Sequence, residues 1–358
     1  MSMFMPIIAG HRGFKAQYPE NTIGGFDKCF ASGASSFETD LYLTTDEVLV
    51  VCHDANTKRT YQYENGDEAD FIITQSSYEK DLKDLVNIKS GDKLLTFKHL
   101  LKWFSSYDLE ENDPKIIMLD VKGTNVKKIT KYIVSEALTI RDDINYWLQR
   151  FQFGYWDIEF VKYINQNEYF QELYDKYDIT EKFQIYHITG NWKLSMAYIG
   201  YNHYLDATYG KERKLFKFTG VSLLYLATWS TDYLEKFIPF AKAEGLSIYN
   251  WTINNVFQYE YFVKVSKNAG IEHYGLISDD PSIMQAHKDK SHDKLDGRVV
   301  VTLSQQLSNW LFSQFLKLLP LKQPDYKSIV NGDERAMKKP PSKVGMYIFQ
   351  ICQRLGIF

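Results

Sequence analysis

The feature that most constrains the fold is the alternation of short β-branched runs with helix-like stretches through residue 290. Amphipathic segments such as Asn21–Ser32 and Asn125–Leu138 separate most of these runs. Repeated strand–helix units imply a parallel sheet, and about eight of them in this length predict a TIM-type (β/α)₈ barrel. The nine candidate strands are Ile7–His11, Phe37–Tyr42, Val48–His53, Ile116–Val121, Phe151–Gly154, Gln184–Ile188, Val221–Leu226, Ser247–Thr252 and Tyr274–Ser278.

A doubly wound open sheet is the alternative fold. It is disfavoured because no G-x-G-x-x-G motif follows the first candidate strand. The link Leu43–Glu47 is too short for a crossover helix. We therefore expect the second and third candidate strands to be neighbours joined by a tight connection.

Composition excludes several classes of protein. A net charge of -3 argues against a protein that coats nucleic acid, and three cysteines are too few for a disulfide framework or a cysteine-based zinc site. Met1–Pro6 leaves no room for a signal peptide before the first strand, and no window has the 18 or so uninterrupted apolar residues of a spanning helix. We expect a protein that faces the cytosol.

Three carboxylates follow the pattern of a metal site. Glu38 and Asp40 alternate along one strand and so point to the same side, and Asp120 ends another apolar run. Carboxylates in an apolar strand repel one another unless a cation lies between them. Hard oxygen ligands predict Mg²⁺ or Ca²⁺. The competing interpretation is three unrelated surface carboxylates at strand ends.

Two histidines also end candidate strands. In a barrel, His11 and His53 are expected at the same mouth, where they could act as general base and general acid on a metal-bound phosphate. A single histidine at a strand end is more often structural, but two beside three carboxylates favour catalysis. Arg12 and Lys122 would supply positive charge to the oxygens of a phosphodiester. His187 is expected to be structural.

At these residues the sequence resembles the glycerophosphodiester phosphodiesterase family over roughly residues 7–285. The resemblance implies a variant TIM barrel that hydrolyses glycerol-bearing phosphodiesters with a divalent metal ion. The matching motifs are Gly10-His11-Arg12-Gly13, Tyr18-Pro19-Glu20-Asn21-Thr22, Glu38-Thr39-Asp40, Thr45-Asp46, His53-Asp54, Leu119-Asp120-Val121-Lys122, Trp251-Thr252-Ile253-Asn254 and Ser278-Asp279-Asp280-Pro281.

The resemblance also implies individual roles. By motif, His11 and His53 match the catalytic pair, and Arg12 and Lys122 fit the phosphate contacts. Trp251 falls where the family places an aromatic residue near the substrate glycerol. The metal ligands of the family match Glu38, Asp40 and Asp120.

Two departures from the wider family point to one branch. Asp120 stands where the third metal ligand is usually Glu, and the chain carries a lipophilic C-terminal extension. Together with the phrase from Phe14 to Thr22, they resemble the fungal phosphatidylglycerol phospholipase C branch. That resemblance implies cleavage of phosphatidylglycerol to diacylglycerol and glycerol 3-phosphate.

The chain divides into a catalytic barrel, residues 1–290, and a basic extension, residues 291–358. From Gly297 onward there are nine basic and three acidic residues. Val299–Leu321 is apolar at helical spacing and contains Trp310, which is typical of an interfacial anchor, although a helix packed on the barrel fits the spacing nearly as well. A second apolar stretch is Val344–Phe358. We expect attachment to an anionic membrane.

The resulting hypothesis is a phospholipase C on the cytoplasmic face of an intracellular membrane or lipid droplet. Its predicted partners are a phospholipid substrate and the membrane surface, with no nucleic acid and no protein partner. The alternatives are a hydrolase of water-soluble deacylated phospholipids and a catalytically idle membrane-tethered scaffold. Phospholipase D cleavage is also chemically open. The loop before the helix is expected to place Asn21 as its N-cap.

Overall fold

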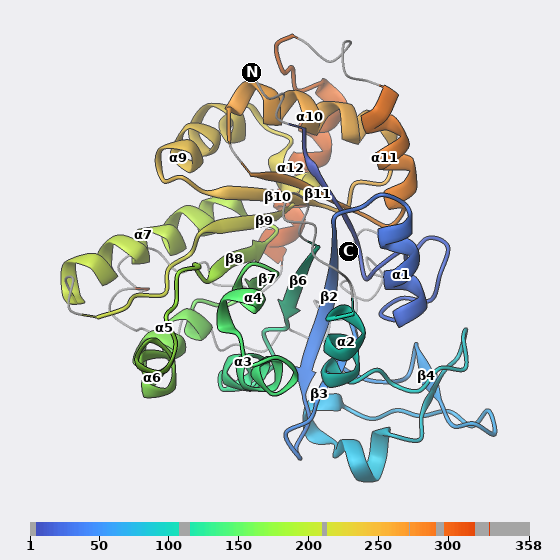
Figure 1. Cartoon of the computed structure of the whole chain (residues 1–358). Helices are drawn as coiled ribbons and strands as arrows, with labels where there is room; N and C mark the ends of the chain where they lie inside the picture. The colour runs from blue at the N-terminus through green and yellow to red at the C-terminus, as the bar shows by residue number, and fades with distance from the viewer. Residues whose placement is uncertain are drawn as a thin grey trace.

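The structure, a computed structural model, describes residues 5–106, 115–209, 213–271, 273–290, 297–318 and 329. Eight parallel strands form a closed barrel, in which β1 pairs with both β11 and β2 (Figure 1). The predicted barrel is confirmed. Its strands are β1 (Ile7–Gly10), β2 (Ser36–Leu43), β6 (Ile116–Val121), β7 (Phe151–Tyr155), β8 (Gln184–Thr189), β9 (Gly220–Leu224), β10 (Ser247–Trp251) and β11 (Tyr274–Ser278).

The ninth candidate strand is β3 (Leu49–Val51), which lies outside the closed barrel and pairs antiparallel with β2. The predicted tight connection is a turn in which the Thr44 hydroxyl accepts the N–H of Val48 at 3.0 Å. The antiparallel return carries the chain back along β2, and the Cys52 N–H donates to the Asp40 carbonyl at 3.1 Å. The following residue, His53, is thereby brought back beside the Asp40 position.

An insertion follows β3, at residues 54–96, for which no element was expected. It contains β4 (Tyr61–Gln62) paired with β5 (Val86–Asn87), and two short helices, η1 (Ile73–Gln75) and η2 (Tyr78–Leu82). A small cluster of buried apolar side chains, including Tyr61, Ile73 and Leu82, packs with residues of β2 and β3. The insertion lies to one side of the barrel, beyond β3 (Figure 1).

Helices surround the barrel (Figure 1). Local sequence explains their ends: the Asn255 side chain accepts the N–H of Gln258 at the start of α10, and Gly270 ends that helix with a φ of 59°. The predicted helical segments Asn21–Ser32 and Asn125–Leu138 both correspond to helices. The helices are α1 (Ile23–Ala31), α2 (Phe97–Phe104), α3 (Ile129–Ile140), α4 (Ile144–Leu148), α5 (Glu159–Gln166), α6 (Glu168–Lys176), α7 (Trp192–Tyr209), α8 (Tyr225–Thr228), η3 (Tyr233–Phe237), α9 (Ile238–Ala243), α10 (Val256–Ala269) and α11 (Pro281–Lys290).

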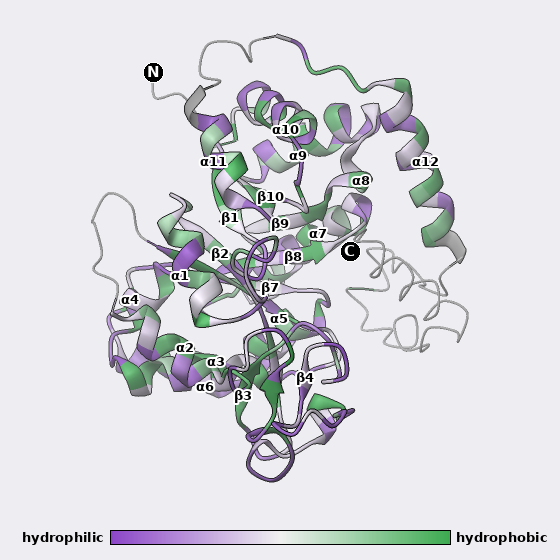
Figure 2. Ribbon diagram, turned by 90° about the vertical axis from the view of Figure 1, so that its right-hand side faces the viewer, coloured by the Kyte–Doolittle hydropathy of each residue, from purple (hydrophilic) through white to green (hydrophobic). Residues whose placement is uncertain are grey.

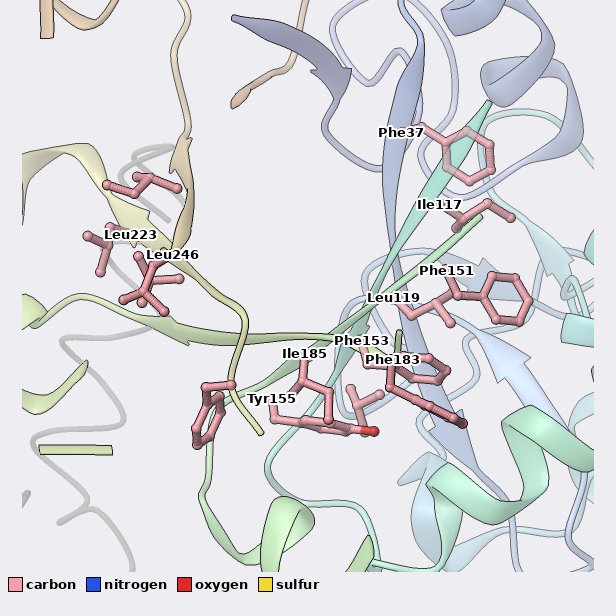
Figure 3. Packing of buried hydrophobic residues seen from close by; sticks show 14 of the residues in the cluster. Phe37, Ile117, Leu119, Phe151, Phe153, Tyr155, Phe183, Ile185, Leu223 and Leu246 are labelled. Carbon is pink, nitrogen blue, oxygen red and sulfur yellow. The ribbon is translucent and has the colours of Figure 1, made fainter. Parts of the chain in front are cut away.

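Strand side chains that point away from the barrel axis form the main core. Figure 3 shows Phe37, Leu119 and Phe153 packed among their neighbours from adjacent strands, and all three are buried. A smaller buried cluster includes Met118, Tyr186 and Tyr249. Side chains fill the inside of such a barrel, so a reactive site belongs at its mouth rather than along its axis.

Two glycines make room for the large tyrosines of this smaller cluster. A Cβ at Gly275 would lie 2.1 Å from the ring of Tyr249, and one at Gly220 would lie 2.4 Å from the ring of Tyr186. Any larger residue at either position would therefore displace a buried aromatic ring. The glycines are needed here for space rather than for turn geometry.

The helix predicted in the C-terminal extension is present as α12 (Leu303–Leu318). One face packs on the barrel, where Phe312 contacts a cluster containing Leu224 and Ala227, with Trp251 at its edge. The other face exposes large apolar side chains, which we call the α12 stripe: Leu303 (84% exposed), Leu307 (57%), Trp310 (56%) and Leu311 (55%). Figure 2 shows α12 alongside α8 at the edge of the molecule.

The interpretation as a helix packed on the barrel is confirmed for one face, and the interfacial anchor stays a prediction for the other. Across the described ranges, no helix combines the length and the apolarity needed to cross a bilayer. The second apolar stretch, Val344–Phe358, lies outside the described residues.

Candidate active site

The three predicted metal ligands come together at one end of the barrel. β2 and β6 pair so that Asp40 lies opposite Asp120, and Glu38 precedes Asp40 by two residues on the same face. All three side chains are buried, and one carboxylate oxygen from each lies within 4.8 Å of the others. The alternative of three unrelated surface carboxylates is therefore wrong.

Two cations lie against this acidic cluster. The Lys122 ammonium is 2.6 Å from Asp40 Oδ1 and 2.6 Å from Asp120 Oδ2, and Arg12 Nε is 3.8 Å from Asp40 Oδ2. The Arg12 N–H also donates to Glu38 Oε2 at 3.0 Å. Because every donor is a hard oxygen, these residues fit a divalent cation such as Mg²⁺ or Ca²⁺.

The pKa shifts of the cluster follow from burial and charge. Burial, with the Asp40 charge next, raises the pKa of Glu38 well above its ordinary value. Burial alone would also raise the pKa of Asp40, but Lys122 above all holds it well below its usual range. Burial raises the pKa of Asp120, against the opposing effect of Lys122. Neighbouring carboxylates that repel one another in this way attract a further cation.

Asn21 supports the cluster instead of capping the helix as predicted. Its φ of 57° places it in the left-handed region, where its amide donates to Asp40 Oδ2 at 3.0 Å and its carbonyl accepts the Thr39 hydroxyl at 2.8 Å. The N-cap of α1 is Thr22, whose hydroxyl accepts the N–H of Gly25 at 3.1 Å. The predicted cap was one residue early because Asn21 is turned inward toward Asp40.

His11 is held by groups from the far end of the barrel sequence. Its Nδ1 lies 2.6 Å from Asp279 Oδ1, just beyond β11, and its Nε2 lies 3.9 Å from Glu38 Oε2. The Asn254 amide donates to the other Asp279 oxygen at 2.9 Å, and the Asn254 carbonyl accepts the Asp279 N–H at 2.9 Å. This chain of contacts fixes the ring with Nε2 toward the acidic cluster.

His53 is held by its own neighbourhood in the sequence. Its Nδ1 lies 2.8 Å from Asp54 Oδ1, and Arg59 from the insertion donates to the other Asp54 oxygen. Arg59 also donates to both oxygens of Glu20, which in turn accepts from Arg12 at 3.2 Å. Burial alone would raise the pKa of Glu20, but Arg59 and Arg12 lower it to about 2. An ionic network therefore joins the insertion to the acidic cluster.

Both histidines have the arrangement of a general base. Hydrogen bonds and nearby cations hold the pKa values of Asp54 and Asp279 well below the ordinary range, so both are ionised and can only accept. Each Nδ1 therefore carries the proton and each Nε2 carries a lone pair. Burial, with a nearby cation next, lowers the pKa of His11 to about 4 and that of His53 to about 3. Each ring is neutral at pH 7 and able to accept a proton.

The predicted substrate contacts lie around the same mouth. Trp251 ends β10, and its ring meets that of Trp156, just beyond β7, edge-to-face at 5.9 Å between centroids. Arg12 and Lys122 are both directed at carboxylates of the cluster. Their predicted contact with phosphate remains a prediction.

His187 lies away from the site. It is fully buried on β8, and its Nδ1 lies 2.9 Å from the hydroxyl of Ser195 on α7. Its neighbours on β8, Tyr186 and Ile188, point to the other side of the sheet. The expectation of a structural histidine is consistent with this position between strand and helix.

Sequence reasoning assigned no role to several groups that complete the site. Asp54 could have been found, because it directly follows His53. Asp279 and Asn254 are polar residues that follow candidate strands, which could have indicated a place at the mouth. Nothing in the sequence, however, predicted their contact with His11. Trp156 lacked any motif, and only the pairing of β6 with β7 brings it to Asp120.

Comparisons with known proteins agree with this architecture. The model of the "Glycerophosphoryl diester phosphodiesterase family" matches residues 11–283. A glycerophosphodiester phosphodiesterase of Bacillus altitudinis is 48% identical over 56 residues, which is 16% of this chain and 23% of that protein. A second, from Caldanaerobacter subterraneus, is 38% identical over 88 residues, or 24% of this chain and 33% of that one. The chain thus matches about a quarter to a third of the length of these relatives.

Solved structures share the fold at low identity. A phosphodiesterase of Oleispira antarctica, in complex with the product sn-glycerol-3-phosphate, superposes with a TM-score of 0.54 at 17% identity, covering 79% of this chain and 97% of that one. A glycerophosphodiester phosphodiesterase of Parabacteroides distasonis superposes with a TM-score of 0.53 at 18% identity, covering 80% and 97%. These likenesses support the barrel fold.

Proposed function

Because the chain belongs to the glycerophosphoryl diester phosphodiesterase family, we propose that it is a metal-dependent hydrolase of phosphodiesters that carry a glycerol group. The observation that carries the proposal is the meeting, at one end of the barrel, of three buried carboxylates with two histidine–aspartate pairs. General acid–base catalysis needs a proton acceptor and a proton donor next to the reacting phosphate.

The residues suggest a two-step reaction. A divalent cation held by Glu38, Asp40 and Asp120 would supply positive charge to the phosphate oxygens and lower the pKa of the neighbouring glycerol hydroxyl. His11 Nε2 takes the proton of that hydroxyl as its oxygen bonds to phosphorus. His53 must enter this step protonated, with the proton taken from bulk water, and it gives that proton to the departing alcohol oxygen as the old P–O bond breaks. Water then opens the resulting cyclic phosphate, with the two roles reversed.

The choice of His11 as the first base rests on its orientation. Its Nε2 is directed at Glu38, so it lies next to the position of the hydroxyl that would be activated. Arg12 and Lys122 would balance the charge that develops on the phosphate. The opposite assignment, with His53 as the first base, uses the same atoms and would give the same products.

A second candidate function is that of a phospholipase C that acts on phosphatidylglycerol. The α12 stripe is the observation that favours it, because these apolar side chains are exposed on a helix that reaches Trp251 at the mouth. Beside it, a cavity of about 670 Å³ lies between α12 and the loops after β8 and β9, lined in part by Trp192, Trp229 and Phe312. The extension as a whole is basic, which suits an anionic lipid surface.

The deciding experiment is product analysis with purified protein, a divalent cation, and two kinds of substrate. Glycerophosphodiesters in solution test the hydrolase, and mixed anionic and zwitterionic vesicles test the lipase. Diacylglycerol and glycerol 3-phosphate from phosphatidylglycerol would establish phospholipase C activity, and phosphatidic acid would indicate phospholipase D cleavage. Hydrolysis of soluble diesters alone would remove the lipid function, and no hydrolysis of either would leave an idle scaffold.

A point variant separates the lipid surface from the catalytic site. Leu307→Glu places a charge in the α12 stripe and should reduce activity on vesicles at least 10-fold while hydrolysis of soluble diesters is unchanged. Ile88→Glu is the matched control, since Ile88 is a similarly exposed apolar residue (47%) on the insertion. Equal activity of both variants on vesicles would contradict the membrane role of α12 and, with it, the proposed location at an intracellular membrane.

A further inference from the structure

Trp156 contacts three parts of the site at once. Its indole N–H donates to Asp120 Oδ1 at 2.7 Å, its ring lies 5.9 Å from the Lys122 ammonium, and it meets the Trp251 ring edge-to-face. The side chain is 36% exposed, so it lies at the open mouth. Trp156 thus connects the proposed metal ligand Asp120, the cation Lys122 and the ring of Trp251.

The register of the barrel explains this position. β6 and β7 pair so that Asp120 lies opposite Gly154, and Trp156 follows two residues later, just beyond the end of β7. A shorter side chain at this point could not reach back across the strand pair to Asp120. The long indole spans that gap while its N–H remains directed at a carboxylate that is itself buried.

Asp120 is the ligand for which such support matters most. Of its two oxygens, Oδ2 contacts the Lys122 ammonium and Oδ1 accepts the Trp156 N–H. Lysine has a flexible stem and a charge that would also be drawn to phosphate, whereas the indole is rigid and neutral. Partners of this kind orient metal ligands and tune their affinity for the ion.

We infer that Trp156 is a positioning residue, which holds the Asp120 carboxylate in the orientation that binds the divalent cation. The inference rests on the proposed function only in requiring that the acidic cluster bind such a cation. Trp156 takes no part in proton transfer, because an indole N–H is only a hydrogen-bond donor and does not ionise near neutral pH. Its effect should therefore appear in cation affinity rather than in catalysis once the cation is bound.

The test compares Trp156→Phe with the wild-type protein by isothermal titration with Mg²⁺ and, separately, with Ca²⁺. Phenylalanine keeps an aromatic ring but removes the N–H, and we expect the affinity for the cation that activates the enzyme to fall on the order of 10- to 100-fold. Hydrolysis of a soluble glycerophosphodiester should lose rate at low cation and recover to within a few-fold at saturating cation. The cation-dependent change in tryptophan fluorescence should also diminish.

Trp147→Phe is the matched control. Trp147 lies on α4, away from the mouth, and its indole N–H donates to the Arg141 carbonyl. Trp147→Phe therefore measures how much cation affinity changes when an indole hydrogen bond is lost elsewhere in the fold. Circular dichroism verifies that each variant is folded. Affinity of Trp156→Phe within twofold of wild type, or equally weakened in Trp147→Phe, would overturn the inference. Wild-type protein that binds neither cation would instead overturn the proposed metal site, and the inference with it.

Discussion

The two sides of the mouth build the same kind of histidine–carboxylate pair by opposite means. On one side, His11, just beyond β1, pairs with Asp279, 268 residues away, because β1 and β11 are adjacent in the barrel. On the other side, His53 pairs with Asp54, the next residue, and Arg59 follows five residues later. One side depends on long-range strand register, and the other depends on a local loop and the insertion.

This difference determines how each side should respond to change. The His11 side is held by Asn254, which is exposed, and Asp279, which is 24% exposed, and each directly follows or lies within three residues of a barrel strand whose own residues are mostly buried. The His53 side is held by Arg59 of the insertion, whose side chain is 51% exposed, although its partners Asp54 (17%) and Glu20 (10%) are largely buried. We therefore expect the first side to be rigid and the second to be adjustable.

Removing the histidines should have the largest effect and should not distinguish the two sides. His11→Ala and His53→Ala should each lower the rate of diester hydrolysis on the order of 10²- to 10⁴-fold, because each removes a proton-transfer group. Steady-state rates at saturating cation, with circular dichroism to verify folding, measure this. Near-normal rates in both variants would end the proposed mechanism.

Replacing the aspartate partner of each histidine should show a difference between the His11 side and the His53 side. In Asp279→Asn and Asp54→Asn, the Nδ1–H of the neighbouring histidine no longer has a charged acceptor. We expect the rate of diester hydrolysis to fall roughly 10- to 100-fold in each variant. We expect the greater loss for Asp279→Asn, since Arg59 and Glu20 still surround the His53 side. The pH dependence of the rate should shift in both variants, which a purely structural defect would not produce. A greater loss in Asp54→Asn would reverse the comparison.

Cutting the link to the insertion should have a smaller effect. Arg59→Met removes the contacts with Asp54 and Glu20. We expect a rate loss of only a few-fold, because Arg59 is itself 51% exposed and acts on His53 only through Asp54. The effect should decrease further with added salt, which screens exposed charges. Lys58→Met is the control, since Lys58 pairs only with Asp70 among the described contacts. A loss comparable to that of His53→Ala would show that the insertion is part of the catalytic machinery.

His187 offers a histidine outside either pair. Burial lowers its pKa to about 3, against about 6.5 in an unfolded chain, so only the unfolded state takes up a proton as the pH falls below 6.5. Protonation of His187 therefore does not affect the free energy of unfolding above pH 6.5. As the pH decreases from 6.5 toward 3, the free energy of unfolding falls by up to about 1.4 kcal/mol per pH unit. His187→Gln should flatten the pH dependence of the unfolding free energy, measured with urea. Parallel curves for wild type and His187→Gln would contradict this.

Sequence alone predicted the features that depend on local pattern. Alternation along β2 revealed that Glu38 and Asp40 share a face, and apolar runs located all the barrel strands. What it missed depends on register between distant strands, as for Asp279 and Trp156, or on a backbone conformation rare for the residue type, as for Asn21. The insertion was missed because its strands are two residues long, which leaves no periodicity to detect.

The pairing of β1 with both β2 and β11 also determines the order in which the site can assemble during synthesis. During synthesis, His11 and Arg12 emerge near the start of the chain, yet the aspartate that orients His11 emerges more than 260 residues later. Before β11 docks, β1 has only one of its two neighbours, and the imidazole has no carboxylate to set its tautomer. We therefore expect the pairing of His11 with its carboxylate to form only after almost the whole barrel has been translated, when β11 docks against β1.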